Sequence, residues 1–326
     1  GVEEKKLGLC ASSTCQIILD GCRVPAFNII GGKGNGFRVA VETLNTGRTS
    51  LGAGSVGGCK QMIKLAVEHA TQRKQFKTRI ADFEMIREKI SEMTAHTYVL
   101  ESMVYMTAGL VDKKVDYSLE GACCKVWGTE LLWKTINESL QIAGGNGFMN
   151  EYPYGRGIRD SRINMIFEGT NEILRALIAL SGLQQPGEQL KELGRAFRDP
   201  LRSLGAIGSY IGGRVKRQVV RPAMTRVHEA LREEADMVAK AVHDLALAVE
   251  KLLIEHGKDV IERQFHQERL ANVAIDLFLS TATLSLGFRR AEFEHPLNGF
   301  GFVVPRREPT RLMACTWTST KFDHRA

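Results

Sequence analysis

Apolar residues recur every three or four positions along much of the chain, and this spacing predicts helices rather than strands. Between residues 86 and 111 the spacing marks one narrow stripe, while Glu92 and Glu101 fall off it. The members of the stripe are Ile86, Ile90, Met93, Thr97, Leu100, Val104, Ala108 and Val111. A helix with a single apolar face of this kind needs a partner helix to cover it.

Three other segments have the same periodicity. Residues 119–140 carry a second stripe that ends at paired glycines, and residues 173–180 carry a third after Thr170, a plausible N-cap. A long helix is expected around 37–72, although several glycines would break or ease it. Four helices with apolar faces predict a four-helix bundle.

The N-terminal stretch has a different pattern. Residues 14–24, TCQIILDGCRV, are rich in Ile, Val and Cys with partial alternation, which predicts one strand or two short ones. The glycine-rich stretch at 31–36, GGKGNG, lacks the Lys-Ser/Thr of a phosphate loop and does not fit GxGxxG. A flexible turn before the first long helix is the favoured interpretation there, ahead of a phosphate cradle.

The C-terminal part is expected to be a separate helical region. Residues 184–189, QQPGEQ, are typical of a linker, and the pattern beyond them predicts helices at 237–254 and 260–286. The predicted organisation is an N-terminal segment, a helical bundle and an appended α-helical region, with these bounds: 1–30, 31–183 and 184–326.

Composition and charge narrow the class of protein. A chain of 326 residues, 44% apolar and 25% charged, is typical of a globular protein of about two domains. The net charge of +7 permits an anionic ligand or membrane surface, but no basic run with interleaved aromatics indicates nucleic acid. Seven cysteines without framework spacing favour reduced thiols in an intracellular compartment. The scattered histidines have no HExxH spacing, so no metal site is expected.

One acid stands out, Glu168 in RINMIFEGTNEILR. Ile166 and Phe167 before it would place the carboxylate against apolar surface, which raises the pKa of a carboxyl toward that of a general base. The helix start after Thr170 would lower the same pKa. From these residues alone, Glu168 is either a helix-leading acid in a turn or a base directed into a pocket. Gly169 would let a ligand approach the backbone.

Several motifs in one order carry a family resemblance. LNTGR at 44–48, RKQF at 73–76, QIAGGNGF at 141–148, Arg159-Asp160 and IFEGTNEILR at 166–175 together resemble the C-terminal half of the acyl-CoA dehydrogenases. GLCASSTCQIILDGCRVPAFNIIG at 8–31 is similar to the end of the β domain that precedes that half. The resemblance covers about 1–183, and the extension beyond it points to the very-long-chain branch and its relative that helps assemble respiratory complex I.

The resemblance implies a mainly α fold. It consists of the C-terminal four-helix bundle of this family, preceded by the last strands of a β domain, of which 1–30 is a remnant, and followed by the appended α-helical region. The family's N-terminal helical domain and most of its β domain have no counterpart in the sequence. This chain alone is therefore not expected to form the whole active site. From about Phe293 onward the sequence has no good match, so the tail is expected to be atypical.

The resemblance also implies roles for the matched residues. Glu168 would remove the α-proton of an acyl-CoA thioester while a hydride passes to N5 of FAD, which gives a trans-2-enoyl-CoA. In some branches the base precedes the arginine matched by Arg48, and here that position is Gly47, which leaves Glu168 as the matching candidate. The residues implied to bind FAD are Arg73, Gln75, Phe76, Gln141, Ile142, Ala143, Gly144, Gly145, Thr170, Asn171 and Glu172. Those implied to line the acyl-CoA path are Asn45, Thr46, Gly47, Arg48 and Gly169.

Further expectations concern partners and location. The resemblance implies long- or very-long-chain acyl-CoA substrates of fatty acid β-oxidation, electron-transferring flavoprotein as acceptor, a homodimer that shares the FAD site, and the mitochondrial matrix at the inner membrane. The alternatives are a scaffold role in respiratory complex I assembly and an incomplete chain without activity.

Residues 195–226 hold eight basic residues and one acid, and wound as a helix they would be amphipathic, which suits an anionic membrane surface. Four glycines in this segment favour a loop or solvated helix instead.

Overall fold

The computed structural model describes residues 1–196, 224, 227–285, 304–305 and 312–313. The chain forms two compact units, Gly1–Asn171 and Glu172–Ala326. The bounds predicted from the sequence, at 30 and 183, remain a prediction. The mainly helical fold expected from the periodicity is confirmed, since long helices make up most of the described residues.

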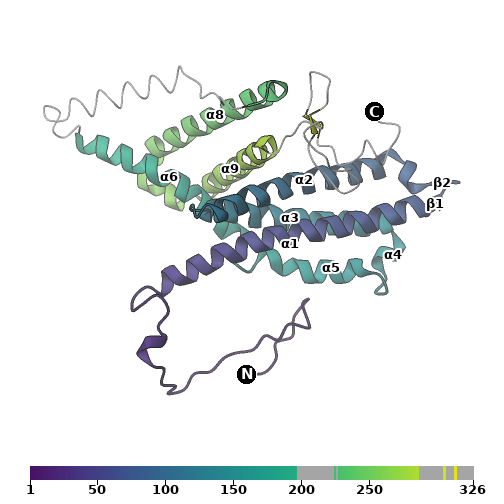
Figure 1. Ribbon diagram of the computed structural model, residues 1–326, viewed down its shortest axis with the longest axis horizontal. Coiled ribbons are helices and arrows are strands. Elements are labelled where there is room, and N and C mark those ends of the chain that lie inside the picture. Colours follow the sequence, from purple (N-terminus) through teal and green to yellow (C-terminus); the bar gives the residue numbers. More distant parts are fainter. Residues whose placement is uncertain (197–223, 225–226, 286–303, 306–311, 314–326) are drawn as a thin grey trace. The chain divides into compact units, whose positions relative to one another are not determined.

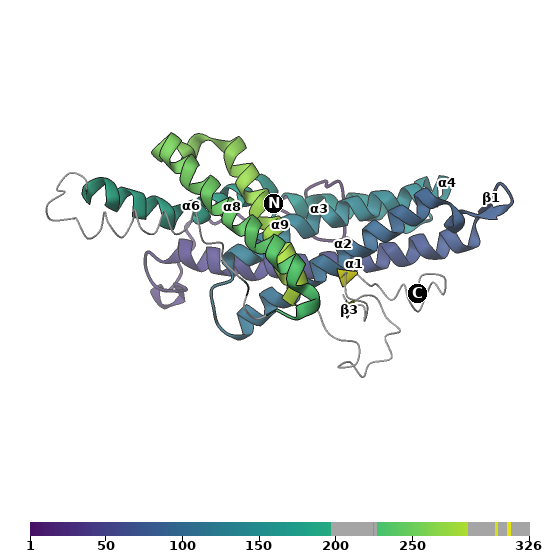
Figure 2. The ribbon, with the colours of Figure 1, turned by 90° about the horizontal axis from the view of Figure 1, so that it is seen from above.

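Three long helices form the body of the first unit. They are α1 (Gly36–Gln72), α2 (Glu84–Asp112) and α3 (Ser118–Ala143). They lie alongside one another in both views (Figure 1, Figure 2). α2 buries the predicted stripe at Met93, Thr97 and Leu100, whereas α3 is buried on several faces. The shared core comprises Val56, Cys59, Met62, Leu100, Leu131, Leu132, Ile136, Ala143 and Tyr154.

Glycines in α1 allow it to lie close against α3. A Cβ built on Gly52 would lie 3.0 Å from Cβ of Cys124, and one built on Gly58 would lie 2.7 Å from Cδ1 of Leu132. Each glycine therefore receives a side chain of α3. Another residue at Gly52 would push the helices apart, whereas one at Gly58 would displace the end of the Leu132 side chain. Two of the glycines expected to weaken α1 are thus used for packing, and the helix runs unbroken for 37 residues.

Short elements connect the long helices. The hairpin of β1 (Lys74–Gln75) and β2 (Thr78–Arg79) follows α1, with Lys74 opposite Arg79, and η2 (Ile80–Asp82) leads into α2. After α3 come α4 (Gly145–Phe148), α5 (Pro153–Ser161) and η3 (Arg162–Met165). η3 leads directly into the loop that carries Glu168.

The strand predicted at 14–24 is absent, and this prediction is wrong for the described chain. The N-terminal segment has only η1 (Ala26–Asn28) as a regular element. Glu4 N–H donates to the carbonyl of Thr14 at 2.9 Å, and the Gly1 ammonium donates to that of Gln16 at 3.0 Å. Residues 17–24 pair with no described strand, and their side chains are exposed. A strand needs a neighbour for its backbone groups, and alternation in the sequence cannot supply one.

The linker predicted at 184–189 is also wrong. α6 (Asn171–Ala196) continues through it with Pro186 inside the helix. Proline removes one backbone hydrogen bond of the helix, so packing must offset the loss. Leu183 before the proline packs with Leu253 and Val260 in the core of the second unit, and Leu190 after it packs on the same core. Packing on both sides of Pro186 thus outweighs the tendency of proline to break a helix.

The rest of the second unit confirms the two further helices. η4 (Glu229–Leu231), α8 (Arg232–His256), η5 (Gly257–Glu262) and α9 (Gln264–Ser285) follow one another along the chain. β3 (Val304–Pro305) pairs antiparallel with β4 (Leu312–Met313). The basic segment 195–226 and the tail after Phe293 lie almost wholly outside the described residues. Among the helices that are described, none is long and apolar enough to cross a membrane.

Candidate functional site

The loop between η3 and α6 holds Glu168 in an unusual backbone conformation. Glu168 has φ of 60° and Gly169 has φ of 92°, so two successive residues are left-handed. Glycine adopts this conformation freely, whereas a residue with a side chain is strained by about 1–3 kcal/mol. Ile166 and Phe167 N–H both donate to the carbonyl of Ile163, at 2.8 and 3.1 Å, and these bonds end η3 just before the strained residues.

α1 supports the loop from one side through Arg48. Arg48 is 7% exposed, and its Nε donates to the Glu168 carbonyl at 3.0 Å. Its Nη1 donates to Oδ1 of Asn45 at 3.0 Å, so Asn45 orients the guanidinium one turn away. Burial lowers the pKa of Arg48, and the nearby Glu168 carboxylate opposes this shift. Arg48 and Asn45, predicted to line the acyl-CoA path, therefore also hold the predicted base.

The Glu168 carboxylate lies against Gly47. A Cβ built on Gly47 would lie 2.7 Å from Oε2 of Glu168 and 2.9 Å from its Cδ and Oε1. Oε2 is buried and accepts no hydrogen bond from any residue that the structure describes. Gly47 is thus needed for the carboxylate to take this position.

α3 supports the loop from the other side through a polar cluster absent from the sequence predictions. Lys125 is fully buried, and its Nζ donates to the carbonyl of Gly169 at 2.8 Å and to Oδ1 of Asn171 at 2.7 Å. Nδ2 of Asn171 in turn donates to Oε1 of Glu130 at 3.0 Å and to Oγ1 of Thr129 at 3.1 Å. The side chain of Asn171, which was predicted to bind FAD, forms hydrogen bonds with residues of α3. The only sequence signal for this cluster is one lysine within a run of small apolar residues.

A second group of predicted residues lies at the opposite end of α3. α3 ends at Ala143, and Gly144 caps it with φ of 59° and ψ of −132°. A Cβ built on Gly144 or Gly145 would meet no atom within 4 Å, so the backbone is open to a ligand there. Gln141 is exposed, whereas Ile142 and Ala143 belong to the buried face.

The hairpin lies at this same end of the bundle (Figure 1, Figure 2). Arg73, Gln75 and Phe76 are exposed, and the ring of Phe76 stands edge-on to Phe83 with centroids 6.4 Å apart. Phe76 and Lys77 have φ of 52° and 67°, the values of a tight hairpin turn. The hairpin therefore presents cations and one aromatic side chain to solvent.

The predicted residues thus form two groups rather than one site. Asn45, Thr46, Gly47, Arg48, Gly169, Thr170 and Asn171 gather around Glu168 near the start of α3, and Glu172 follows in the first turn of α6. The residues around Gly144 and the hairpin lie near its end. Lys125 and Gly144 are 19 positions apart on this helix, which is roughly 28 Å at 1.5 Å per residue.

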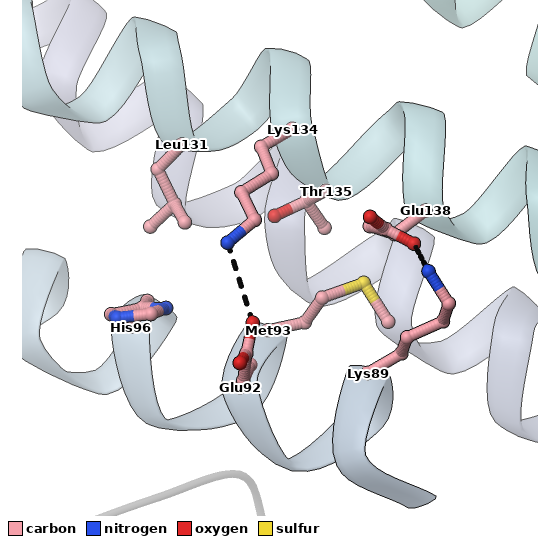
Figure 3. Close-up of a pocket in the computed structure, with 8 residues that line it drawn as sticks. All are labelled: Lys89, Glu92, Met93, His96, Leu131, Lys134, Thr135 and Glu138. Carbon is pink, nitrogen blue, oxygen red and sulfur yellow. Dashed lines mark hydrogen bonds and ion pairs between the residues drawn. The ribbon is translucent and has the colours of Figure 1, made fainter. Parts of the chain in front are cut away.

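A small cleft between α2 and α3 belongs to neither group (Figure 3). Lys134 pairs with Glu92 at 3.3 Å, and Lys89 pairs with Glu138, so two ion pairs bridge the helices. The cleft has room for about one water molecule, too little for a cofactor. Burial lowers the pKa of His96, which also lines it. No group of three or more metal-ligating side chains exists among the described residues.

Comparisons with known proteins agree with the mainly helical fold. Residues 34–183 match the family profile "Acyl-CoA dehydrogenase, C-terminal domain", and residues 229–296 match "ACAD9/ACADV, C-terminal domain". The very long-chain specific acyl-CoA dehydrogenase, mitochondrial, of Bos taurus is 40% identical over 301 residues, which are 91% of this chain and 46% of that protein. The Homo sapiens protein of the same name is 39% identical over the same shares.

Solved structures give the same result. The acyl-CoA dehydrogenase complexed with FAD from Bacillus anthracis is 32% identical, with a TM-score of 0.71 over 87% of this chain and 49% of that one. The butyryl-CoA dehydrogenase of Megasphaera elsdenii is 31% identical, with a TM-score of 0.55 over 56% of this chain. The chain spans about half the length of the curated relatives that it matches. The chain belongs to the acyl-CoA dehydrogenase family, an oxidoreductase family, of which it carries the C-terminal domain and an appended C-terminal region.

Proposed function

We propose that the chain is part of an FAD-dependent dehydrogenase that converts long- or very-long-chain acyl-CoA to trans-2-enoyl-CoA, with Glu168 as the base. One observation carries this proposal. Oε2 of Glu168 is buried beside Gly47 without a described hydrogen-bond partner, while two helices anchor the backbone around it. A buried and unbonded carboxylate oxygen on an anchored backbone is suited to accept a proton from a substrate carbon.

In the proposed reaction, Glu168 transfers the proton and Arg48 anchors the backbone of Glu168. Glu168 accepts the α-proton at a carboxylate oxygen. Arg48 fixes the Glu168 carbonyl, which leaves the side chain of Glu168 as the mobile part of the base. The backbone N–H of Glu168 would donate to the thioester oxygen and stabilise the enolate that develops there. FAD, when bound, supplies the acceptor for the hydride that leaves the β-carbon.

The two groups of residues fit FAD in different ways. The open backbone at Gly144 and Gly145 and the exposed cations of the hairpin suit a diphosphate and its nucleotide. Thr170 and the start of α6 would face the flavin half instead. Because the groups are roughly 28 Å apart along α3, we infer that one FAD takes residues from two copies of the chain in a homodimer.

The location proposed for this protein is supported by its relatives, and the electron acceptor is proposed from the family resemblance. The curated proteins of Bos taurus and Homo sapiens are mitochondrial, and we propose the same compartment for this protein, in the matrix at the inner membrane. Electron-transferring flavoprotein is the proposed acceptor of the electrons. A role in respiratory complex I assembly is the second candidate, since the profile that matches residues 229–296 covers two kinds of protein, ACAD9 and ACADV.

The test is Glu168→Gln in the full-length protein. We expect FAD to stay bound while flavin reduction by palmitoyl-CoA slows by about 10²–10⁴-fold or more, because glutamine cannot accept the proton. Anaerobic rapid mixing that follows flavin absorbance measures this rate. Glu151→Gln, an exposed glutamate before α5, is the matched control and should leave the rate unchanged.

Two outcomes decide between the candidates. Flavin reduction in the Glu168→Gln variant at a near wild-type rate would show that Glu168 is not the base. Association with complex I assembly intermediates that survives Glu168→Gln would favour the scaffold role, since that role needs the fold and not the proton acceptor.

A further inference from the structure

Lys125 has a place in the structure that the proposed reaction does not yet explain. It is the largest fully buried side chain in the described chain, and it lies on α3 between Cys124 and Val126, both of them fully buried. An ammonium is strongly hydrated in water, and burial removes that hydration unless specific contacts replace it. A lysine at this position is therefore expected to have a defined task.

The contacts of Lys125 converge on the loop of the base. Its Nζ lies 2.8 Å from the carbonyl oxygen of Gly169 and 2.7 Å from Oδ1 of Asn171. Arg48 donates to the carbonyl directly before, that of Glu168, at 3.0 Å. Two successive carbonyls of one loop are thus held by two buried basic side chains from two different helices. These carbonyls belong to the two residues that have left-handed φ angles.

We propose that Lys125 is a positioning residue for the base. By holding the Gly169 carbonyl, it keeps Glu168 in the left-handed conformation that places the carboxylate beside Gly47. Glu168 is a residue with a side chain and would relax to negative φ if one support were removed. The inference rests on the proposed function, because it takes Glu168 as the base.

Asn171 and its neighbours complete the support. The amide of Asn171 connects Lys125 to Glu130, with Thr129 as a further acceptor, so the ammonium and a carboxylate lie at the two ends of one hydrogen-bonded chain. This chain ties the first residue of α6 to α3. Movement of Lys125 would therefore change both the Gly169 peptide and the start of the helix that follows it.

The experiment compares Lys125→Met and Lys125→Gln with Lys134→Met in the full-length protein. Methionine keeps the length of the side chain without a donor, and glutamine retains a neutral donor. Lys134 lies on the same helix, and its ion pair with Glu92 is half-exposed (Figure 3), so its replacement removes a lysine without touching the loop. Amide hydrogen exchange of 166–170, without FAD, reports the loop directly. Flavin reduction by palmitoyl-CoA and by its α-dideuterated form reports the proton transfer.

We expect Lys125→Met to fold and to bind FAD. Exchange in 166–170 should become at least tenfold faster while exchange in α2 stays the same. Flavin reduction should slow by about 10–100-fold, because a displaced base is no longer aligned with the α-proton of the substrate. The isotope effect of α-deuteration should increase, since proton removal then limits the rate. Lys125→Gln should be intermediate in each measurement, and Lys134→Met should match the wild type.

The contrary outcomes are distinct. Unchanged exchange and rate in Lys125→Met would overturn the positioning role. Loss of folded protein in both Lys125 variants would also overturn it, because the bonds would then serve the fold and not the base. Glu168→Gln in the same experiment separates a failure of the proposed function from a failure of the positioning role. Full activity there refutes the proposed function, whereas inactivity there with unaffected Lys125 variants refutes only the positioning.

Discussion

The two ends of α3 are built in opposite ways. At its start, Lys125 and Arg48 hold the Glu168 loop from two sides, and the carboxylate fits against Gly47. At its end, Gly144 and the neighbouring hairpin face open space. The first group is held together by contacts between residues of this one chain. The second is an exposed surface, where we propose that a second copy of the chain completes an FAD site.

Gly47→Ala tests the closed end, where we expect the largest effect. The new methyl would lie 2.7 Å from Oε2 of Glu168, so the carboxylate must turn away. Because the far end of a flexible side chain can move, the fold should survive, and alanine even favours a helix by about 1 kcal/mol over glycine. Flavin reduction in the full-length protein should fall by about 100-fold, since displacement of a reacting group by about 1 Å has such an effect.

Gly54→Ala is the control for that prediction. Gly54 lies on the same helix, and a Cβ there meets no atom within 4 Å. It should raise the midpoint of thermal unfolding slightly and leave the rate unchanged. An active Gly47→Ala variant would mean that the carboxylate does not need the position seen here.

Gly144→Ala tests the open end through the backbone. Its φ of 59° with ψ of −132° is a conformation that residues with a side chain rarely adopt. Strain and not steric collision should therefore destabilise the variant by about 2 kcal/mol. Urea unfolding of the full-length protein measures this. Unchanged stability would mean that the end of α3 relaxes without cost.

Gly145→Ala should have the smallest effect on the fold. Gly145 has neither a positive φ nor an atom within 4 Å of a built Cβ, so stability should change by less than about 1 kcal/mol. The added methyl would stand where we propose that FAD approaches the backbone. The dissociation constant for FAD, measured by fluorescence titration of the apoprotein, should rise about tenfold, or about 1.4 kcal/mol. Unaltered affinity would place FAD elsewhere.

Most helices of the fold could be predicted from the sequence. Periodicity located α1, α2, α3, α8 and α9, because each buries apolar side chains that recur every three or four positions. It failed at 14–24, where the pattern of a strand is present but no partner strand is, and at 184–189, where packing overrides Pro186. Both failures concern interactions between distant segments, which local patterns do not contain.

The candidate site was predictable to a different extent at its two ends. The motifs and their order indicated Glu168, Gly47 and Arg48, and these residues meet in the structure. Lys125 was missed because its acceptor at Gly169 is 44 positions away, and its apolar neighbours in the sequence do not by themselves show that a lysine is fully buried. Whether the residues at the end of α3 bind FAD remains a prediction.

The close seam between α1 and α3 has a consequence for how this family can vary. Gly52 faces Cys124 and Gly58 faces Leu132, so a change in the register of the two helices would disturb their packing at both points. Insertion of one residue between Arg48 and Gly52 would turn everything on its N-terminal side by about 100° and shift it by about 1.5 Å. Gly47 would then leave the carboxylate and Arg48 would leave the Glu168 carbonyl. We therefore expect homologues to tolerate substitutions along this part of α1 but not changes in its length.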